Sequence, residues 1–343
     1  MRKLYMMLFA VFAAIALLTS CEHKDFCYDH GGHQERIEYM LNLNYDRSWE
    51  YGLDGQSYWE NRMPDYGVTH KELQPAEPEG VRVHIYNDDA QESERNLRKQ
   101  GGEVFFQEEK RYDMLFYNND TEYIVFEGTD QFKTAYATTR TLVRSTYRGN
   151  SKITRGTKES TMTPPDMLYG AYIDSITVKK SVEVTPMDVT MHPLVYTYLI
   201  RFEVSKGAEH VAQAKGALAG MARGVQMHDG RTTKDVATVM FDCQIVDSSF
   251  GVMATVKTFG VPDYPNPNYT RGERKYGVAL EMLLKNGNFQ QHDFDVTEQV
   301  EDQPTGGIIV IKGIEIDETR DESKGFIIGV DGWGDVVDVP LPL

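Results

Sequence analysis

The segment YDMLFYNNDTEYIVFEG, residues 112–128, decides the fold class. Two apolar arms rich in aromatic residues flank the polar run Asn118–Thr121. Asn and Asp tolerate left-handed backbone and hydrogen-bond to their own turn, so this pattern predicts a β-hairpin.

Strand patterns also occur on both sides of this segment. In RIEYMLNLNY, residues 36–45, apolar and aromatic residues alternate with polar ones, and YTYLIRFEV, residues 196–204, shows the same period of two. Such alternation is typical of half-buried strands. The sequence therefore predicts an all-β protein built from two antiparallel β-sandwiches in tandem.

One segment departs from the strand pattern. GAEHVAQAKGALAGMARG, residues 207–224, is rich in alanine, but its glycines at 216, 220 and 224 each cost helix stability. We expect at most a short helix here, followed by a segment packed closely on the sheet.

The run TPPD, residues 163–166, interrupts the strands, because consecutive prolines cannot continue a ladder. The predicted organisation is a signal peptide (1–20), a tether (21–35), an N-terminal β-sandwich domain (36–170) and a C-terminal β-sandwich domain (171–343).

The N-terminus has the features of a secretion signal. Arg2 and Lys3 precede an apolar run over residues 5–18, which is short for a membrane span. The run ends in Leu18-Thr19-Ser20-Cys21, which resembles the lipobox of bacterial lipoproteins. A plain signal peptide is the alternative. The lipobox predicts lipidation of Cys21 and anchoring in a membrane. The following EHKD resembles an export signal of Bacteroidales lipoproteins, which places the protein on the outer face of the outer membrane.

The charge limits the partners. The net charge is −16, and it becomes −18 without residues 1–20, because that segment holds two basic residues and no acidic ones. This balance excludes nucleic acid as a partner, since its phosphates need a basic surface.

Catalytic signals are absent from the sequence. It contains no G-x-S-x-G, H-E-x-x-H or P-loop motif, so we expect no enzyme and no cofactor. His23, Cys27, His30 and His33 could surround zinc, but a solvated tether explains them better, and we expect no metal. Cys243 lies in an apolar strand pattern, which predicts a buried, unpaired thiol.

A group of aromatic residues precedes the second strand pattern. They could stack on sugars or dock a protein, or they could fold back as a lid over the first sheet, which we favour. The group consists of Trp49, Tyr51, Tyr58, Trp59 and Tyr66.

Several stretches together resemble a family of Bacteroidales lipoproteins related to fimbrillins. They are CEHKDFCYDH (21–30), YDMLFYNNDTEYIVFEG (112–128), AKGALAGMARG (214–224) and DGWGDVVDVPLPL (331–343). The resemblance implies transthyretin-like sandwiches, a role in fimbriae or cell adhesion, and no enzymatic activity. Related fimbrillins are cut after an arginine, and the candidates here are Arg36, Arg47 and Arg62.

The expected function is a lipid-anchored fimbrial accessory protein, an anchor or a minor adhesive subunit, whose partners are the outer membrane and fimbrial subunits. The C-terminal run with Val336, Val337 and Val339 suits a final strand of its own domain, which favours a subunit that donates no strand. The alternative is a surface glycan-binding lipoprotein of a polysaccharide uptake system. A hydrolase has only unplaced carboxylates in its favour.

Overall fold

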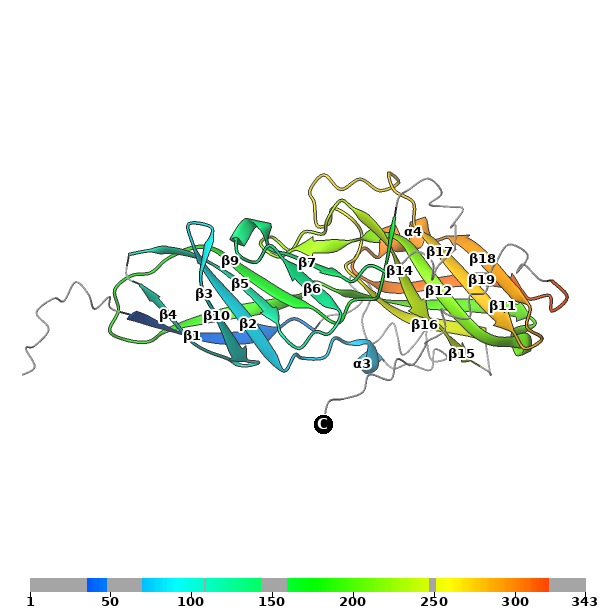
Figure 1. Cartoon of the computed structure of the whole chain (residues 1–343), viewed down its shortest axis with the longest axis horizontal. Helices are drawn as coiled ribbons and strands as arrows, with labels where there is room; N and C mark the ends of the chain where they lie inside the picture. Colours follow the sequence, from blue (N-terminus) through cyan, green and yellow to red (C-terminus); the bar gives the residue numbers. More distant parts are fainter. Residues whose placement is uncertain (1–35, 48–69, 108, 143–158, 247–250, 321–343) are drawn as a thin grey trace, which may run out of the picture.

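The computed structural model describes residues 36–47, 70–107, 109–142, 159–246 and 251–320, and Figure 1 shows a protein made mostly of strands. The helices in this part of the chain are short: α3 (His70–Leu73), α4 (Thr297–Asp302) and the 3-10 turns η3 (Phe132–Thr134) and η5 (Ala208–His210). No helix in the described ranges has the length and apolar character needed to cross a membrane.

The first sheet is a closed barrel of seven strands in the order β1-β10-β9-β5-β2-β3-β4. Its strands are β1 (Arg36–Tyr45), β2 (Gly80–Asn87), β3 (Ala90–Arg98), β4 (Gly101–Gln107), β5 (Arg111–Asn118), β9 (Tyr169–Thr177) and β10 (Thr185–Pro193). The alternation seen in the sequence places Ile37 and Leu41 of β1 and Val83 of β2 in the barrel core, where each is at most 2% exposed. β1 pairs parallel with β10 and antiparallel with β4.

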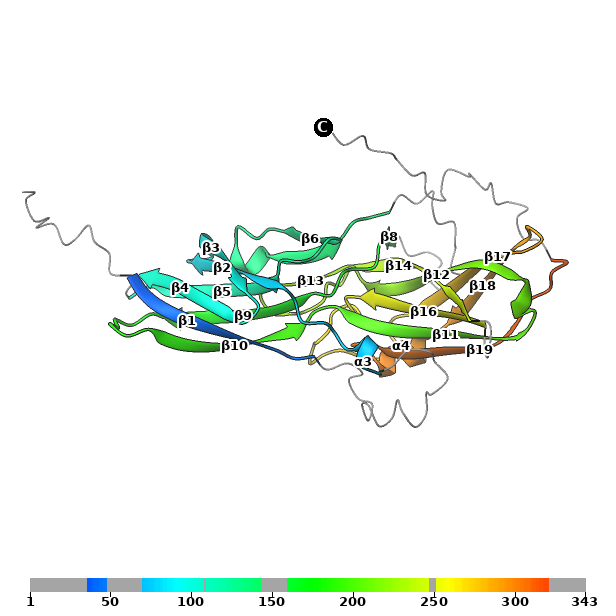
Figure 2. The same ribbon diagram turned by 90° about the horizontal axis from the view of Figure 1, so that it is seen from below.

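Two further sheets share one core at the other end of the elongated molecule (Figure 2). One has the order β15-β16-β11-β19 and the other β18-β17-β12-β14-β8. The strands are β8 (Ser160–Met162), β11 (Tyr196–Lys206), β12 (Val211–Ala222), β14 (Val236–Asp242), β15 (Gln244–Val246), β16 (Gly251–Thr258), β17 (Gly277–Leu284), β18 (Phe289–Asp295) and β19 (Gly307–Glu315). Tyr198 and Phe202 of β11 and Leu218 of β12 are fully buried in this core.

A small sheet joins the two halves. It consists of β6 (Ile124–Glu127), β7 (Tyr136–Thr139) and β13 (Gly224–Gln226), in the order β13-β7-β6. Beside it lies a third core, in which Tyr117 of β5 and Val225 of β13 are both buried. The barrel and the C-terminal sheets are therefore connected by packed side chains and by main-chain hydrogen bonds.

The two halves of the chain also exchange strands. β8 precedes residue 170 but pairs parallel with β14 of the C-terminal sheets, whereas β9 and β10 belong to the barrel. The main passage from the barrel to the second core lies between Pro193 and Tyr196. The domain boundary near residue 170 stays a prediction. The chain itself passes between the barrel and the C-terminal sheets at β8 and again between Pro193 and Tyr196.

The all-β class is confirmed, and the finer architecture differs from the expectation. The first half closes into a barrel, and three pairs are parallel: β1 with β10, β11 with β19, and β14 with β8. The C-terminal run over residues 331–343 lies outside the described residues.

The hairpin predicted for residues 112–128 is wrong. β5 lies between β2 and β9 in the barrel, while β6 pairs with β7 in the small sheet. The turn residues bond to another segment, because the buried side chain of Asn118 accepts from Tyr169 N at 2.7 Å and donates to Met167 O at 3.1 Å. Asp166 accepts from Glu122 N at 2.6 Å. These long-range bonds direct β6 away from β5.

The alanine-rich segment is a strand, apart from the 3-10 turn η5 at residues 208–210. Its glycines mark close approaches, as expected. A Cβ at Gly216 would lie 2.1 Å from the Phe241 ring, and a Cβ at Gly224 would lie 2.3 Å from Ala137 O. The composition resembled a helix because small residues are needed where neighbouring groups come this close.

We expect Gly216→Ala to destabilise the protein by about 1–3 kcal/mol, because the new methyl group overlaps the buried ring of Phe241. Urea unfolding measures this change. The double variant G216A/F241L removes the overlap and should recover part of the loss. If G216A destabilised the F241L variant as much as it destabilises the protein with Phe241, this account would be contradicted.

Candidate functional site

Many residues singled out from the sequence lie outside the described residues. These are Cys21, the cluster His23, Cys27, His30 and His33, the aromatic group Trp49, Tyr51, Tyr58, Trp59 and Tyr66, and Arg62. Their lipidation, ligand binding and cleavage stay predictions. Within the described part of the chain, no group of three or more His, Cys, Asp or Glu residues is placed to hold a metal ion.

The two described candidate cleavage sites lie at opposite ends of β1. Arg36 is exposed at the first residue of the strand, opposite Gln107 of β4. Arg47 lies two residues beyond the last residue of β1, and its Nε donates to Pro75 O at 2.8 Å. Glu77 lies 3.7 Å from the Arg47 guanidinium and 3.2 Å from Lys99 Nζ. The chain leaving β1 is thus held against the segment before β2, and Glu77 links that segment to the turn between β3 and β4.

Tyr45 strengthens the same end of β1. Its hydroxyl donates to Lys99 O at 2.8 Å, and its ring meets Tyr169 edge-on at 5.4 Å between centroids. Burial raises the pKa of Tyr45 to about 12, so the hydroxyl stays protonated and donates at neutral pH. β1 is therefore fixed along both edges and at its end.

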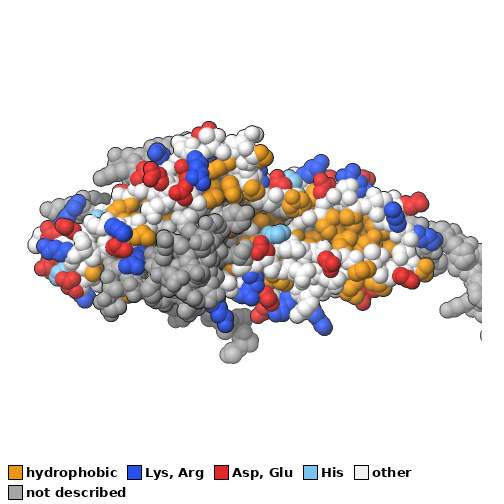
Figure 3. Space-filling model, turned by 180° about the vertical axis from the view of Figure 1, so that it is seen from behind, with side chains coloured by type: hydrophobic (Ala, Val, Ile, Leu, Met, Phe, Trp, Pro, Cys, Tyr) orange, Lys and Arg blue, Asp and Glu red, His pale blue; other side chains and the backbone are white. Residues whose placement is uncertain are grey.

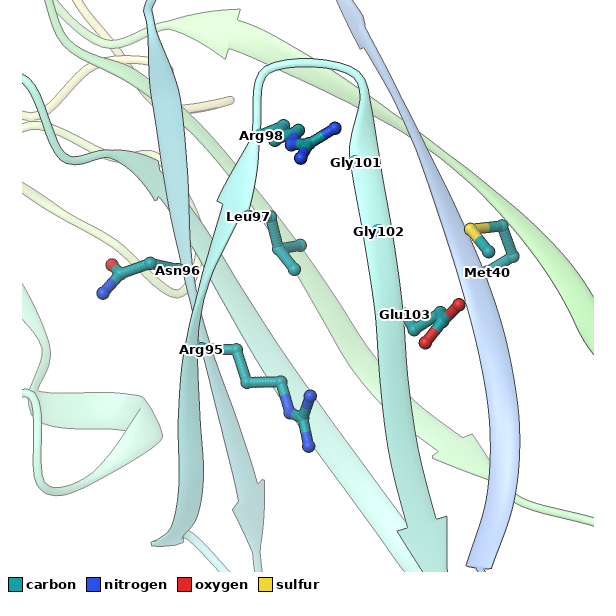
Figure 4. Close-up of a pocket in the computed structure, with 8 residues that line it drawn as sticks. All are labelled: Met40, Arg95, Asn96, Leu97, Arg98, Gly101, Gly102 and Glu103. Carbon is teal, nitrogen blue, oxygen red and sulfur yellow. The ribbon is translucent and has the colours of Figure 1, made fainter.

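A groove opens between β3 and β4. These strands pair at Arg98 and Gly101, beside their turn, and diverge beyond it. Figure 4 shows Leu97 of β3 pointing into the gap between the two strands. The groove holds about 480 Å³ and is lined by Met40, Arg95, Asn96, Leu97, Arg98, Gly101, Gly102 and Glu103.

The chemistry of this groove is that of a binding surface. The guanidinium of Arg95 lies 4.8 Å from the centre of the Phe105 ring, a cation–π contact that holds the side chain in place. Gly101 adopts φ +112°, and a Cβ there would lie 1.9 Å from Leu41 O, so only glycine fits this turn. The lining includes the guanidinium groups of Arg95 and Arg98 and the carboxylate of Glu103, so the groove offers charges of both signs to a bound molecule.

A second, smaller hollow of about 300 Å³ contains Cys243, Lys215 and Asp242. Cys243 is a free thiol, as expected, but it is half-buried rather than fully buried, because it lies at the turn between β14 and β15. Burial raises the pKa of this thiol, with a further contribution from Asp242, so it is not poised as a thiolate nucleophile.

A row of polar side chains crosses the five-stranded sheet beside this hollow. Lys215 of β12 lies opposite both Asp242 of β14 and Glu281 of β17, and Glu281 lies opposite Gln291 of β18. Burial raises the pKa of Glu281 to about 7, against the opposing charge of Lys215. An acid within the apolar run YGVALEMLL was a sequence signal for this position, and our sequence analysis did not use it.

Charges of both signs are interspersed on the face shown in Figure 3, with apolar side chains between them. Among the described residues on that face, the Lys and Arg side chains lie among acidic and apolar ones and form no broad basic patch of the kind that nucleic acid requires.

Comparisons with known proteins place this chain among β-rich proteins of the Bacteroidales. Residues 69–242 match the family described as "Domain of unknown function (DUF5119)". A candidate fimbrium anchoring subunit, Fim4B from Bacteroides ovatus, is 26% identical over 96% of this chain and 96% of its own length.

A solved structure shares the fold. A candidate adhesin from Bacteroides ovatus superposes with a TM-score of 0.57 at 23% identity, covering 82% of this chain and 93% of that one. The fimbrial anchor protein Mfa2 from Porphyromonas gingivalis gives a TM-score of 0.47 at 10% identity, over 80% of this chain and 90% of its own.

Glu281→Gln should stabilise the protein more at pH 8 than at pH 5. The folded-state pKa is raised from 4.5 to about 7, so the folded state binds the extra proton and loses stability as the pH rises through this interval. We expect a gain of roughly 1–3 kcal/mol at pH 8 and a much smaller gain at pH 5, measured by urea unfolding. The exposed Glu122→Gln is the control. An equal gain at both pH values would refute the assignment.

Proposed function

The chain belongs to the DUF5119 family, and from this premise we propose that it is a fimbrial accessory protein of the cell surface, an anchor or a minor adhesive subunit, held in the outer membrane by a lipid on Cys21. The observation that carries the proposal is the distant relation to a candidate fimbrium anchoring subunit over nearly the whole of both chains. A match of this extent includes the N-terminal segment together with both halves of the fold.

The position of the N-terminus supports an anchor. β1 starts at the end of the barrel that is farthest from the C-terminal sheets, as both views show (Figures 1 and 2). Arg36 follows Cys21 by fifteen positions, and a chain of about 3.3–3.6 Å per residue could span roughly 50 Å over them. A lipid on Cys21 would therefore leave the rest of the molecule free to extend from the membrane toward fimbrial subunits.

The fate of β1 separates an anchor from a polymerising subunit. Cleavage after Arg47 or Arg62 would remove β1 with the tether, whereas cleavage after Arg36 would leave β1 in the barrel. β1 contributes Ile37, Leu41 and Leu43 to the barrel core and pairs on both edges, so its loss would open the barrel. We propose that the protein retains both β1 and its lipid.

We also propose that the two halves correspond to tandem sandwiches of the transthyretin-like kind. The two C-terminal sheets share one core, which supports a sandwich there. The barrel has two thin seams: β3 meets β4 at Arg98 and Gly101, and β9 meets β10 at Gly170 and Tyr169. These seams divide it into layers β4-β1-β10 and β9-β5-β2-β3, as in a sandwich closed at its corners.

Fimbrial subunits should co-purify with the protein from detergent-solubilised outer membranes. Affinity isolation through a tag placed in the exposed turn at Asn286–Gly287 keeps both chain ends unchanged. The control is Cys21→Ala, which should release the protein from the membrane fraction. Isolation of the lipidated protein without any fimbrial subunit, from cells that display fimbriae, would argue against the proposed role.

Mass spectrometry of the membrane-isolated protein should find a mature N-terminus at Cys21 that carries acyl chains. A processed N-terminus immediately after Arg36, Arg47 or Arg62 would contradict the anchor. An unmodified N-terminus near Cys21 would contradict lipidation and leave the fimbrial role to the co-purification experiment.

A further inference from the structure

β19 forms an edge of its sheet in the described part of the chain. It pairs with β11 on one side, and α4 lies on the other. The first half of the strand is GIIVI, residues 307–311, which has no charge and four consecutive β-branched residues. An open edge of this composition is a template for pairing with another chain.

Gln299 of α4 and Gln303, which caps the C-terminal end of the helix, occupy this edge. Gln303 Oε1 accepts from Ile308 N at 2.7 Å, and Gln303 Nε2 donates to Ile308 O at 2.9 Å. Gln299 Oε1 accepts from Val310 N at 2.8 Å, and its Nε2 donates to Val310 O at 3.2 Å. Each amide thus supplies the donor and the acceptor that the main chain of a neighbouring strand would supply.

The spacing of the two elements explains why one helix can do this. Four residues of α-helix advance about 6 Å, and two residues of strand advance about 6.6 Å. Gln299 lies in α4 and Gln303 is the residue that caps its C-terminal end, four positions later, while Ile308 and Val310 are two residues apart on one edge of β19. The two side-chain amides therefore match two successive outward-facing peptide groups.

Packing holds this arrangement in place. Val300 of α4 is fully buried in the second core, and the Tyr198 hydroxyl donates to Gln303 O at 2.6 Å. A Cβ on residue 307 would lie 2.0 Å from Gln303 Oε1, so Gly307 provides the space for the amide. The cap is thus part of the folded core.

The remainder of β19 is protected in another way. Lys312 places a charge on the strand, and Gly313 has φ +76° where the register with β11 shifts. A charge and a bulge both disfavour the addition of a further strand. Only the uncharged half of the strand requires a cap.

We propose that Gln299 and Gln303 seal a latent pairing surface at Ile308–Val310, whose partner is a second copy of this chain joined through its own β19 edge. Two copies of the uncharged run can pair edge to edge without placing like charges opposite each other. The proposal does not depend on the fimbrial role.

The test is the double variant Q299M/Q303M of the mature full-length protein with Cys21→Ala, which keeps side-chain volume and removes all four hydrogen bonds. Analytical ultracentrifugation should show association that increases with concentration, beyond that of the protein with both glutamines. At low concentration, hydrogen exchange of the Ile308 and Val310 amides should be at least about tenfold faster, and protection should return as the copies associate. Near-ultraviolet circular dichroism verifies that the variants are folded.

Three further variants keep the test decisive. Adding Val310→Lys to the double variant places a charge on the open edge and should abolish the association while the fast exchange persists. The control Q131M/Q213M changes two exposed glutamines far from β19 and should behave as the parent. Unchanged sedimentation of folded Q299M/Q303M, or association that survives V310K, would overturn the proposal. The single variant Q299M keeps the Gln303 bonds and so disturbs the fold less. Its association and its hydrogen exchange are judged by the same outcomes.

Discussion

A main-chain N–H or C=O at the edge of a strand must find a partner when it is removed from water, and this requirement shapes every sheet of the molecule. The barrel meets it by closing on itself, with β1 between β10 and β4. The four-stranded sheet meets it at β19 with the side-chain amides of Gln299 and Gln303. β3, whose seam with β4 is thin, carries Glu92, Glu94, Arg95 and Arg98 along its length and so protects its edge with charge. These are different solutions to one problem, and each depends on particular side chains.

The same requirement ties the two halves of the chain together. β8 adds to β14 of the C-terminal sheets, while β9 and β10 return to complete the barrel. β7 pairs with β6 from the first half and with β13 from the second. Because the third core also buries Tyr86 and Leu115 from the barrel with Ala222 and Met227 from the second half, bending at this junction would expose apolar surface and break ladder hydrogen bonds. A pull applied at one end of the molecule would therefore be transmitted to the other through packed strands.

The strands were predictable from the sequence, and their pairing was not. Alternation placed Ile37, Leu41 and Val83 on buried faces because the side-chain period of a strand is a local property. Pairing depends on distant groups. Asn118 bonds to Tyr169 and Met167, and no local pattern around residue 118 could indicate this. The expected hairpin is therefore two strands in different sheets. The glycines at 216 and 224 correctly indicated close packing. They did not indicate which groups come close, namely the Phe241 ring and the Ala137 carbonyl. Of the candidate sites, only the positions of Arg36, Arg47 and Cys243 could be compared with the structure, while the β3–β4 groove and the amide cap arise from tertiary contacts.

The arrangement of β1 links anchoring to the integrity of the barrel. The strand that completes the barrel follows the proposed lipid site by fifteen residues, and Arg47 is fastened by Pro75 and Glu77 directly after it. A cut after Arg47 would separate the lipid and β1 from the rest of the chain in one step, which removes the anchor and opens the barrel together. A cut after Arg36 would remove the lipid alone, because β1 would still pair with β10 and β4. In the proposed lipid-anchored protein, β1 therefore stays covalently joined to the chain and occupies, between β10 and β4, the space that a strand from another subunit would need.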